Sequence, residues 1–281
     1  MKIPTLLLLS LCVAVVARAG LQTDIEYGLA DGESLKLDAY VPDGAGPFPA
    51  VILVHGGGWN GGDKSGGPQK GYMAPMQEPL QRAGFAWFSI NYRLTPKHPY
   101  PACIEDVETA IRWVKSHAAE YHLDPQRIAL SGESAGGHLV ALAAVQMKDD
   151  TRLAAIVPFY GLFDMTQRVK PGELLDSTMA RLFASAVADE KTMAVARAAS
   201  PLFAVKAGLP PFLLVHGSVD QSVPYQQSVE MQQRLRAVGV PCDLMTIEGG
   251  VHGMLYWDKV APDYKDRVIA WLEKTLGVAA R

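Results

Sequence analysis

The sequence predicts an α/β fold with a mostly parallel central sheet flanked by helices. Short, continuously apolar segments such as 50–54 are typical of strands that are buried on both faces of a parallel sheet. Between them lie segments whose apolar residues recur at helical spacing, as at 104–118. Because such strands and helices alternate over most of the chain, the sequence favours an α/β architecture.

The first two expected strands differ from the others because only a short turn joins them. The segments 25–27 and 35–41 flank Asp31-Gly32, a pair that is typical of tight hairpin turns. They therefore predict some antiparallel pairing at one edge of the sheet. Further strands are expected at 50–54, 85–90, 127–130, 154–159, 212–216 and 242–247.

The expected helices follow the strands in turn. The first ends near Gly84, a residue type that favours helix C-termini. The second carries Ile104, Val107 and Ile111 on one face, and the third consists mainly of small residues. Helices are expected at 76–83, 104–118, 135–145, 226–238 and 264–276.

Residues 162–200 interrupt the alternation, since they show helical patches but no strand. The interruption follows a strand, and α/β folds place their sites at the carboxyl ends of strands. We therefore expect this segment to be a short inserted cap within a single domain that spans residues 20–281.

Composition excludes two broad classes of protein. The chain of 281 residues is 49% hydrophobic and 20% charged, which argues against a disordered chain. Its net charge of −3 argues against a nucleic-acid-binding protein.

The three cysteines of the chain are too few and too scattered for a disulfide framework or a four-ligand zinc site. We expect Cys103 and Cys242 to be buried thiols, although an exported protein could pair them.

The N-terminal residues 1–19 are typical of a signal peptide. A short positive start, an apolar run at 6–16 and the small-x-small sequence Ala17-Arg18-Ala19 precede Gly20. The alternative is an uncleaved anchor. Cleavage removes Lys2 and Arg18 and no acid, so the net charge moves from −3 to −5. No later stretch is long and apolar enough to span a bilayer, so the sequence predicts a secreted or periplasmic protein.

Residues 132–136, Gly-Glu-Ser-Ala-Gly, match the G-x-S-x-G motif of a nucleophile elbow. The motif lies between an expected strand and an expected helix, which is the context it requires. A sharp turn there would expose the hydroxyl of Ser134 at a helix N-terminus. The alternative is an ordinary strand–helix turn.

Residues 55–59, His-Gly-Gly-Gly-Trp, follow another buried strand. Backbone N–H groups in a glycine-rich loop can meet the negative charge that develops on a carbonyl oxygen during acyl transfer. We expect Gly57, Gly58 and Ala135 to supply these donors. A phosphate-binding loop is the alternative, but the sequence G-x-x-x-x-G-K-[ST] is missing and no helix is expected directly after the glycines.

A serine nucleophile needs a base, and the base needs an acid to orient it. Of the seven histidines, His252 is the best candidate because it follows the last expected strand directly. Asp220 follows the preceding strand, and the order Ser134, Asp220, His252 is that of an α/β-hydrolase. Asp164 is the rival acid. His216 also lies at a strand end, where a structural role is the preferred interpretation.

These motifs together resemble the α/β-hydrolase superfamily. The sequence is similar to the hormone-sensitive-lipase-like esterases and to the neighbouring acetylxylan/feruloyl (BD-FAE-like) esterases. The resemblance covers residues 25–278 and implies Ser134, Asp220 and His252 as a catalytic triad, with an oxyanion hole as assigned above. Further matches are Asn91-Tyr92-Arg93-Leu94, Pro101-Ala102 with Asp106, and Gly217-Ser218-x-Asp220. Only a short segment precedes the oxyanion loop, which argues against a true lipase.

The resulting expectation is a serine carboxylesterase that needs no metal or organic cofactor. Its substrates would be short acyl or aromatic esters, including acetyl or feruloyl groups of plant polysaccharides. The alternatives are an amidase or peptidase that uses the same triad, such as a formamidase, and a non-catalytic binding module. We expect Trp59, Tyr160, Met165 and Phe183 near the substrate.

Overall fold

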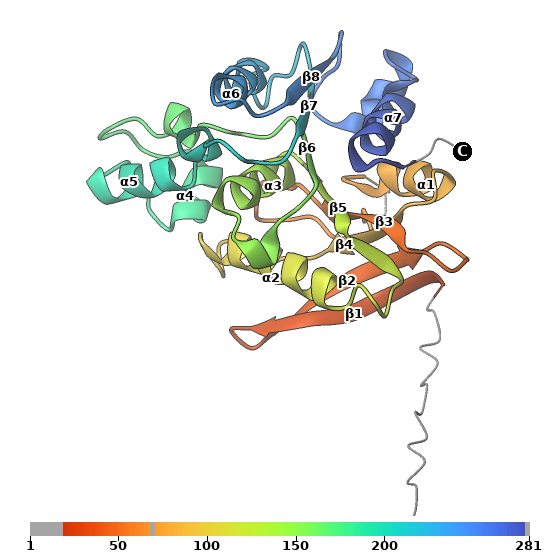
Figure 1. Ribbon diagram of the computed structural model, residues 1–281. Coiled ribbons are helices and arrows are strands. Elements are labelled where there is room, and N and C mark those ends of the chain that lie inside the picture. Colours follow the sequence, from red (N-terminus) through yellow and green to blue (C-terminus); the bar gives the residue numbers. More distant parts are fainter. Residues whose placement is uncertain (1–18, 68–70, 279–281) are drawn as a thin grey trace, which may run out of the picture.

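The computed structural model describes residues 19–67 and 71–278. They form an eight-stranded sheet in the order β1-β2-β4-β3-β5-β6-β7-β8, with helices on both faces (Figure 1). Residues 1–18 of the predicted signal peptide lie outside the described part. The strands are β1 Gly20–Ala30, β2 Glu33–Val41, β3 Phe48–Val54, β4 Ala86–Ile90, β5 Leu123–Glu133, β6 Ala155–Phe159, β7 Phe212–Gly217 and β8 Cys242–Ile247.

The pairing confirms a mostly parallel sheet with an antiparallel edge. Strands β1, β2 and β4 pair antiparallel, and all later pairs, from β4–β3 to β7–β8, are parallel. Every residue of β3, β4, β6 and β7 is buried, as expected of strands covered on both faces.

Two separate apolar cores lie on the two faces of this sheet. One face packs against α1 Ala74–Arg82 and α7 Tyr264–Leu276. The other packs against α2 Ala102–Ser116, α3 Ala135–Gln146 and α6 Gln226–Ala237. Almost all of α3 is buried, which explains why its sequence is apolar all round rather than amphipathic.

Several strands are longer than the sequence predicts, and the difference is largest for β1 and β5. Strand β1 extends over Gly20–Ala30 because it pairs with the whole of β2. Strand β5 begins at Leu123 rather than at 127, since Leu123 pairs with Phe48 before a register shift that brings Ile128 opposite Ala50. Asp124 and Pro125, residue types that are typical of turns, thus lie within an irregular strand.

The segment 162–200 contains helices and no strand of the sheet, as predicted. It comprises the short 3-10 helix η2 Met165–Arg168, then α4 Ser177–Phe183 and α5 Glu190–Ala198. Asp164 accepts a hydrogen bond from the N–H of Thr166 and caps η2. The carboxylate of Asp164, the alternative acid for the triad, therefore caps a helix instead.

Two further features follow from the described residues. Cys103 and Cys242 are both buried and free, and burial raises the pKa of each thiol to about 12. No helix within residues 19–67 and 71–278 is long and apolar enough to cross a membrane.

Candidate active site

Ser134 occupies a strained turn between β5 and α3. Its backbone has φ 52° and ψ −115°, outside the regions that a serine ordinarily adopts. Only glycine fits two residues before and two residues after Ser134. A Cβ on Gly132 would lie 2.6 Å from the oxygen of Gly136, and a Cβ on Gly136 would lie 2.2 Å from the oxygen of Val54. The glycines of the motif therefore let the turn pack against β3 and expose the serine.

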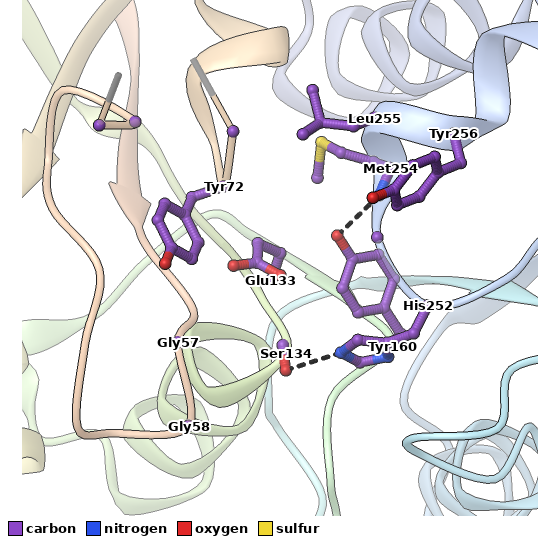
Figure 2. A pocket seen from close by; sticks show the side chains of 14 residues that line it. Gly57, Gly58, Tyr72, Glu133, Ser134, Tyr160, His252, Met254, Leu255 and Tyr256 are labelled. Atoms are coloured by element: carbon purple, nitrogen blue, oxygen red, sulfur yellow. Dashed lines mark hydrogen bonds between the residues drawn. The ribbon is translucent and has the colours of Figure 1, made fainter. Parts of the chain in front are cut away.

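The structure brings Ser134, His252 and Asp220 together from three separate strand ends. Nε2 of His252 lies 3.0 Å from Oγ of Ser134, and Nδ1 lies 2.7 Å from Oδ2 of Asp220 (Figure 2 shows the first contact). A carboxylate only accepts, so Nδ1 carries the ring hydrogen and Nε2 faces the serine hydroxyl with a lone pair. This is the geometry that a general base requires.

Asp220 is held in its ionised form. Its side chain is fully buried, which alone would raise its pKa, but hydrogen bonds from His216 and His252 outweigh burial and hold the pKa well below its usual range. The N–H groups of Ser222 and Val223 donate to its other oxygen at 2.8 and 2.9 Å. The carboxylate is thus charged and fixed beside His252.

The glycine-rich loop after β3 contains two residues with positive φ. Gly57 and Gly58 have φ of 97° and 61°, and a Cβ on Gly57 would lie 2.3 Å from the oxygen of Gly61. Both residues line the same cavity as Ser134. Ala135 begins α3, so its N–H has no acceptor within the helix. The role of these N–H groups as oxyanion donors stays a prediction.

Two buried histidines hold this region in place. The ring of His55 stacks on Tyr92 at 4.4 Å, and its Nδ1 lies 2.8 Å from the oxygen of Gly56. His138 accepts from Nε1 of Trp59 at 3.2 Å and contacts the oxygen of Ala199 at 2.7 Å. Burial lowers the pKa of both histidines to about 4, so both are neutral near pH 7.

Glu133 is an ionisable group beside the nucleophile to which the sequence analysis assigned no role. Its side chain is buried, and its Oε1 has no hydrogen-bond partner among the described residues. Burial raises its pKa to about 7, although His252, the N–H of Gly56 and the hydroxyl of Tyr160 oppose the shift. Its carboxyl fills the space that a side chain on Gly56 would need.

The cavity beside Ser134 has a volume of about 540 Å³, and its mainly apolar walls come from glycines and from aromatic and aliphatic side chains. Tyr160 lines it, as expected, and its hydroxyl accepts from the N–H of Met254 at 3.1 Å (Figure 2). Its ring meets that of His252 edge to face at 4.7 Å. Opposite lies Tyr72, and Leu255 and Tyr256 form a partly exposed rim.

Three residues that we expected near the substrate do not line this cavity. Trp59 is buried, since its indole turns inward to bond His138. Met165 is fully buried and Phe183 is half-buried, and both pack the inserted segment onto the core. Helix α4 does approach Gly58 through Thr178, but no residue of 162–200 lines the cavity. A lid role for this segment stays a prediction.

The residues that sequence reasoning missed come from the turn before α1 and from the short 3-10 helix η4 Met254–Lys259. Tyr72 follows a glycine-rich stretch, and Met254, Leu255 and Tyr256 follow His252 after one glycine, Gly253. Their proximity to the motif residues along the chain was the one available signal. Within residues 19–67 and 71–278, no cluster of three or more histidine, cysteine or acidic side chains could hold a metal ion.

The chain is similar to one family model and to curated ester hydrolases. The BD-FAE family model matches residues 37–235. Among curated proteins, the chain is 36% identical over 231 residues to the probable carboxylic ester hydrolase LipM of Mycobacterium tuberculosis, covering 76% of the chain and 52% of LipM. It is 34% identical to the esterase LipQ of the same organism, over 77% of the chain and 53% of LipQ. The chain thus spans about half the length of the curated relatives it matches.

Solved structures resemble the whole fold. A truncated carbohydrate esterase from gut microbiota superposes with a TM-score of 0.77 at 27% identity, covering 92% of this chain and 97% of that one. Esterase 2 of Thermogutta terrifontis, phosphonylated by sarin, gives a TM-score of 0.78 at 26% identity, covering 93% and 97%. These neighbours confirm the α/β-hydrolase fold.

Proposed function

The chain belongs to the BD-FAE family, and on that premise we propose that it is a serine carboxylic-ester hydrolase. The observation that carries the proposal is the contact chain from Ser134 through His252 to the buried, charged Asp220. The names of LipM, LipQ and the structural neighbours support the same class of reaction.

In the acylation step, Nε2 of His252 takes the proton of Ser134 as Oγ attacks the ester carbonyl carbon. The carbonyl oxygen becomes an oxyanion, which the N–H groups of Gly57, Gly58 and Ala135 stabilise. The bond to the leaving oxygen then breaks, the protonated His252 donates its proton to the alcohol, and Ser134 is left acylated. Asp220 stabilises the imidazolium throughout.

In the deacylation step, water replaces the alcohol. His252 removes a proton from the water as its oxygen attacks the acyl carbon, and the same N–H groups stabilise the second oxyanion. Collapse of this intermediate breaks the bond to Oγ of Ser134, which regains its proton from His252. The products are a carboxylic acid and free enzyme, so the reaction needs no cofactor.

For the substrate, we propose short acyl or aromatic esters, including acetyl or feruloyl groups of plant polysaccharides. The cavity supports this class because it combines room for an aromatic acyl group with walls from Tyr72, Tyr160 and Met254. The rim at Leu255 and Tyr256 opens to solvent, where a bulky alcohol can remain outside.

The test is a panel of substrates assayed with the wild type and Ser134→Ala. We expect the wild type to hydrolyse p-nitrophenyl acetate and methyl ferulate, and the variant to lose at least about 10³-fold in kcat. Acetylated xylan tests the polysaccharide, and an acyl anilide tests the amidase alternative. Unchanged turnover by a folded Ser134→Ala variant would exclude the mechanism.

We further propose that the chain is exported and cleaved after Ala19. Strand β1 begins at Gly20, so the proposed mature chain begins where regular structure does. The expected result is a protein outside the cytoplasm whose N-terminal sequence begins at Gly20. A chain that keeps residues 1–19 would contradict cleavage.

A further inference from the structure

The acid of the candidate triad contacts a second histidine. His216 is the fifth residue of β7 and is fully buried. Its Nε2 lies 3.4 Å from Oδ2 of Asp220, the same oxygen that binds His252. The mechanism proposed above gives this ring no role, although it lies directly behind the catalytic acid.

The partners of His216 fix the position of its ring hydrogen. Nε2 lies 3.0 Å from the carbonyl oxygen of Val223, and Nδ1 lies 2.7 Å from Oγ of Ser228. A carbonyl oxygen only accepts, so Nε2 must carry the hydrogen. In the neutral ring Nδ1 then accepts from the hydroxyl of Ser228, which is itself buried. The Nε2–H is therefore directed toward the Val223 and Asp220 oxygens.

We propose that His216 is a positioning residue that holds the Asp220 carboxylate in place beside His252, and that Ser228 anchors the ring of His216 through Nδ1. The proposal rests on the proposed ester hydrolysis. It extends the contact chain from Ser134 through His252, Asp220 and His216 to the first turn of α6. A partial positive charge on Nε2–H stabilises the carboxylate and limits its rotation about the Cβ–Cγ bond.

The surroundings of His216 define what its removal would change. The titratable groups that face it are Asp220, with His252 beyond, and the phenols of Tyr160 and Tyr225, whose rings meet the imidazole nearly edge to face. Without the Nε2–H, the Asp220 carboxylate is less stabilised and attracts the His252 imidazolium more strongly. The protonated, inactive form of the triad then persists to higher pH.

The experiment compares His216→Leu with His216→Gln, using kcat/KM for p-nitrophenyl acetate as a function of pH. Leucine fills the site without a donor, whereas the amide of glutamine can place an N–H near the position of Nε2.

For His216→Leu we expect kcat to fall about tenfold with little change in KM, because a hydrogen bond to a charged group is lost. We also expect the acid limb of the profile to move to higher pH. His216→Gln should restore most of kcat and should return the acid limb close to its wild-type pH.

A packing defect alone would impair both variants alike and leave the acid limb in place, and that result would overturn the proposal. So would a folded His216→Leu variant with wild-type kinetics. If His216→Leu does not fold, Ser228→Ala decides, since it removes the hydroxyl that anchors Nδ1 and lets the ring turn away from Asp220 while keeping the imidazole. The Ser228→Ala variant should show the same upward shift of the acid limb, and an unchanged profile would refute the proposal. A wild type without esterase activity would instead refute the proposed function.

Discussion

Glu133 should make the stability of this protein fall as the pH rises from about 4.5 to 7. Its carboxyl is buried beside Gly56, and burial raises its pKa from an ordinary 4.5 to about 7. In this interval the unfolded chain gives up the proton while the folded chain retains it, so rising pH favours unfolding. The contribution of neutral Glu133 to stability is complete below pH 4.5 and is lost by about pH 7.

The magnitude follows from the size of the pKa shift. One pKa unit corresponds to about 1.4 kcal/mol, so a rise from 4.5 to about 7 corresponds to about 3 kcal/mol of unfolding free energy. Glu133→Gln has nearly the same shape and cannot ionise. Its stability relative to wild type should therefore increase by about 3 kcal/mol between pH 4.5 and pH 8.

Urea unfolding followed by circular dichroism at several pH values measures this difference. Effects of the substitution that do not depend on pH cancel when the two ends of the range are compared. Glu173→Gln, at an exposed site in the inserted segment, is the matched control and should track the wild type. A Glu133→Gln difference that stays constant from pH 4.5 to 8 would refute the reasoning that burial keeps this carboxyl neutral.

Three further predictions concern the candidate site. Asp220→Asn keeps the shape of the acid but favours the wrong tautomer of His252, so kcat should fall by about 10⁴ in an ester hydrolysis assay; a loss below tenfold would contradict the role of the acid. Gly57→Ala places a Cβ 2.3 Å from the oxygen of Gly61 at a residue with positive φ, so the oxyanion loop must shift. The kcat of this variant should therefore fall by at least about 10²-fold. A normal kcat in the folded variant would exclude Gly57 as a donor. Tyr256→Ala removes an exposed part of the rim. The KM for methyl ferulate should therefore rise several-fold, while the KM for p-nitrophenyl acetate changes little. Equal changes in KM for the two esters would contradict an aromatic contact at Tyr256.

The sequence predicted the fold and the central contacts because both depend on local patterns. Buried strands such as β3 are continuous apolar runs, and Ser134, Asp220 and His252 each follow an expected strand. Carboxyl ends of parallel strands meet at one edge of the sheet, so the order of the motifs along the chain was enough to predict that these three side chains meet.

The walls of the cavity could not be predicted in the same way. An apolar residue next to a motif can turn toward the substrate or into the core, and the sequence does not decide between them. Trp59 turns inward because His138 offers an acceptor from another element. Tyr72 lines the cavity from the turn before α1, and Tyr256 lines it from the short 3-10 helix η4. The raised pKa of Glu133 likewise depends on its packing against Gly56, a contact across two strands.

The central claim is that Ser134 is the nucleophile, and titration with paraoxon tests it most directly. The account predicts release of about one equivalent of p-nitrophenol per chain, parallel loss of esterase activity, and a diethylphosphoryl adduct that peptide mass spectrometry locates on Ser134. The folded Ser134→Ala variant should release none. Inactivation without an adduct on Ser134, or an adduct on another residue that accounts for the lost activity, would contradict the account.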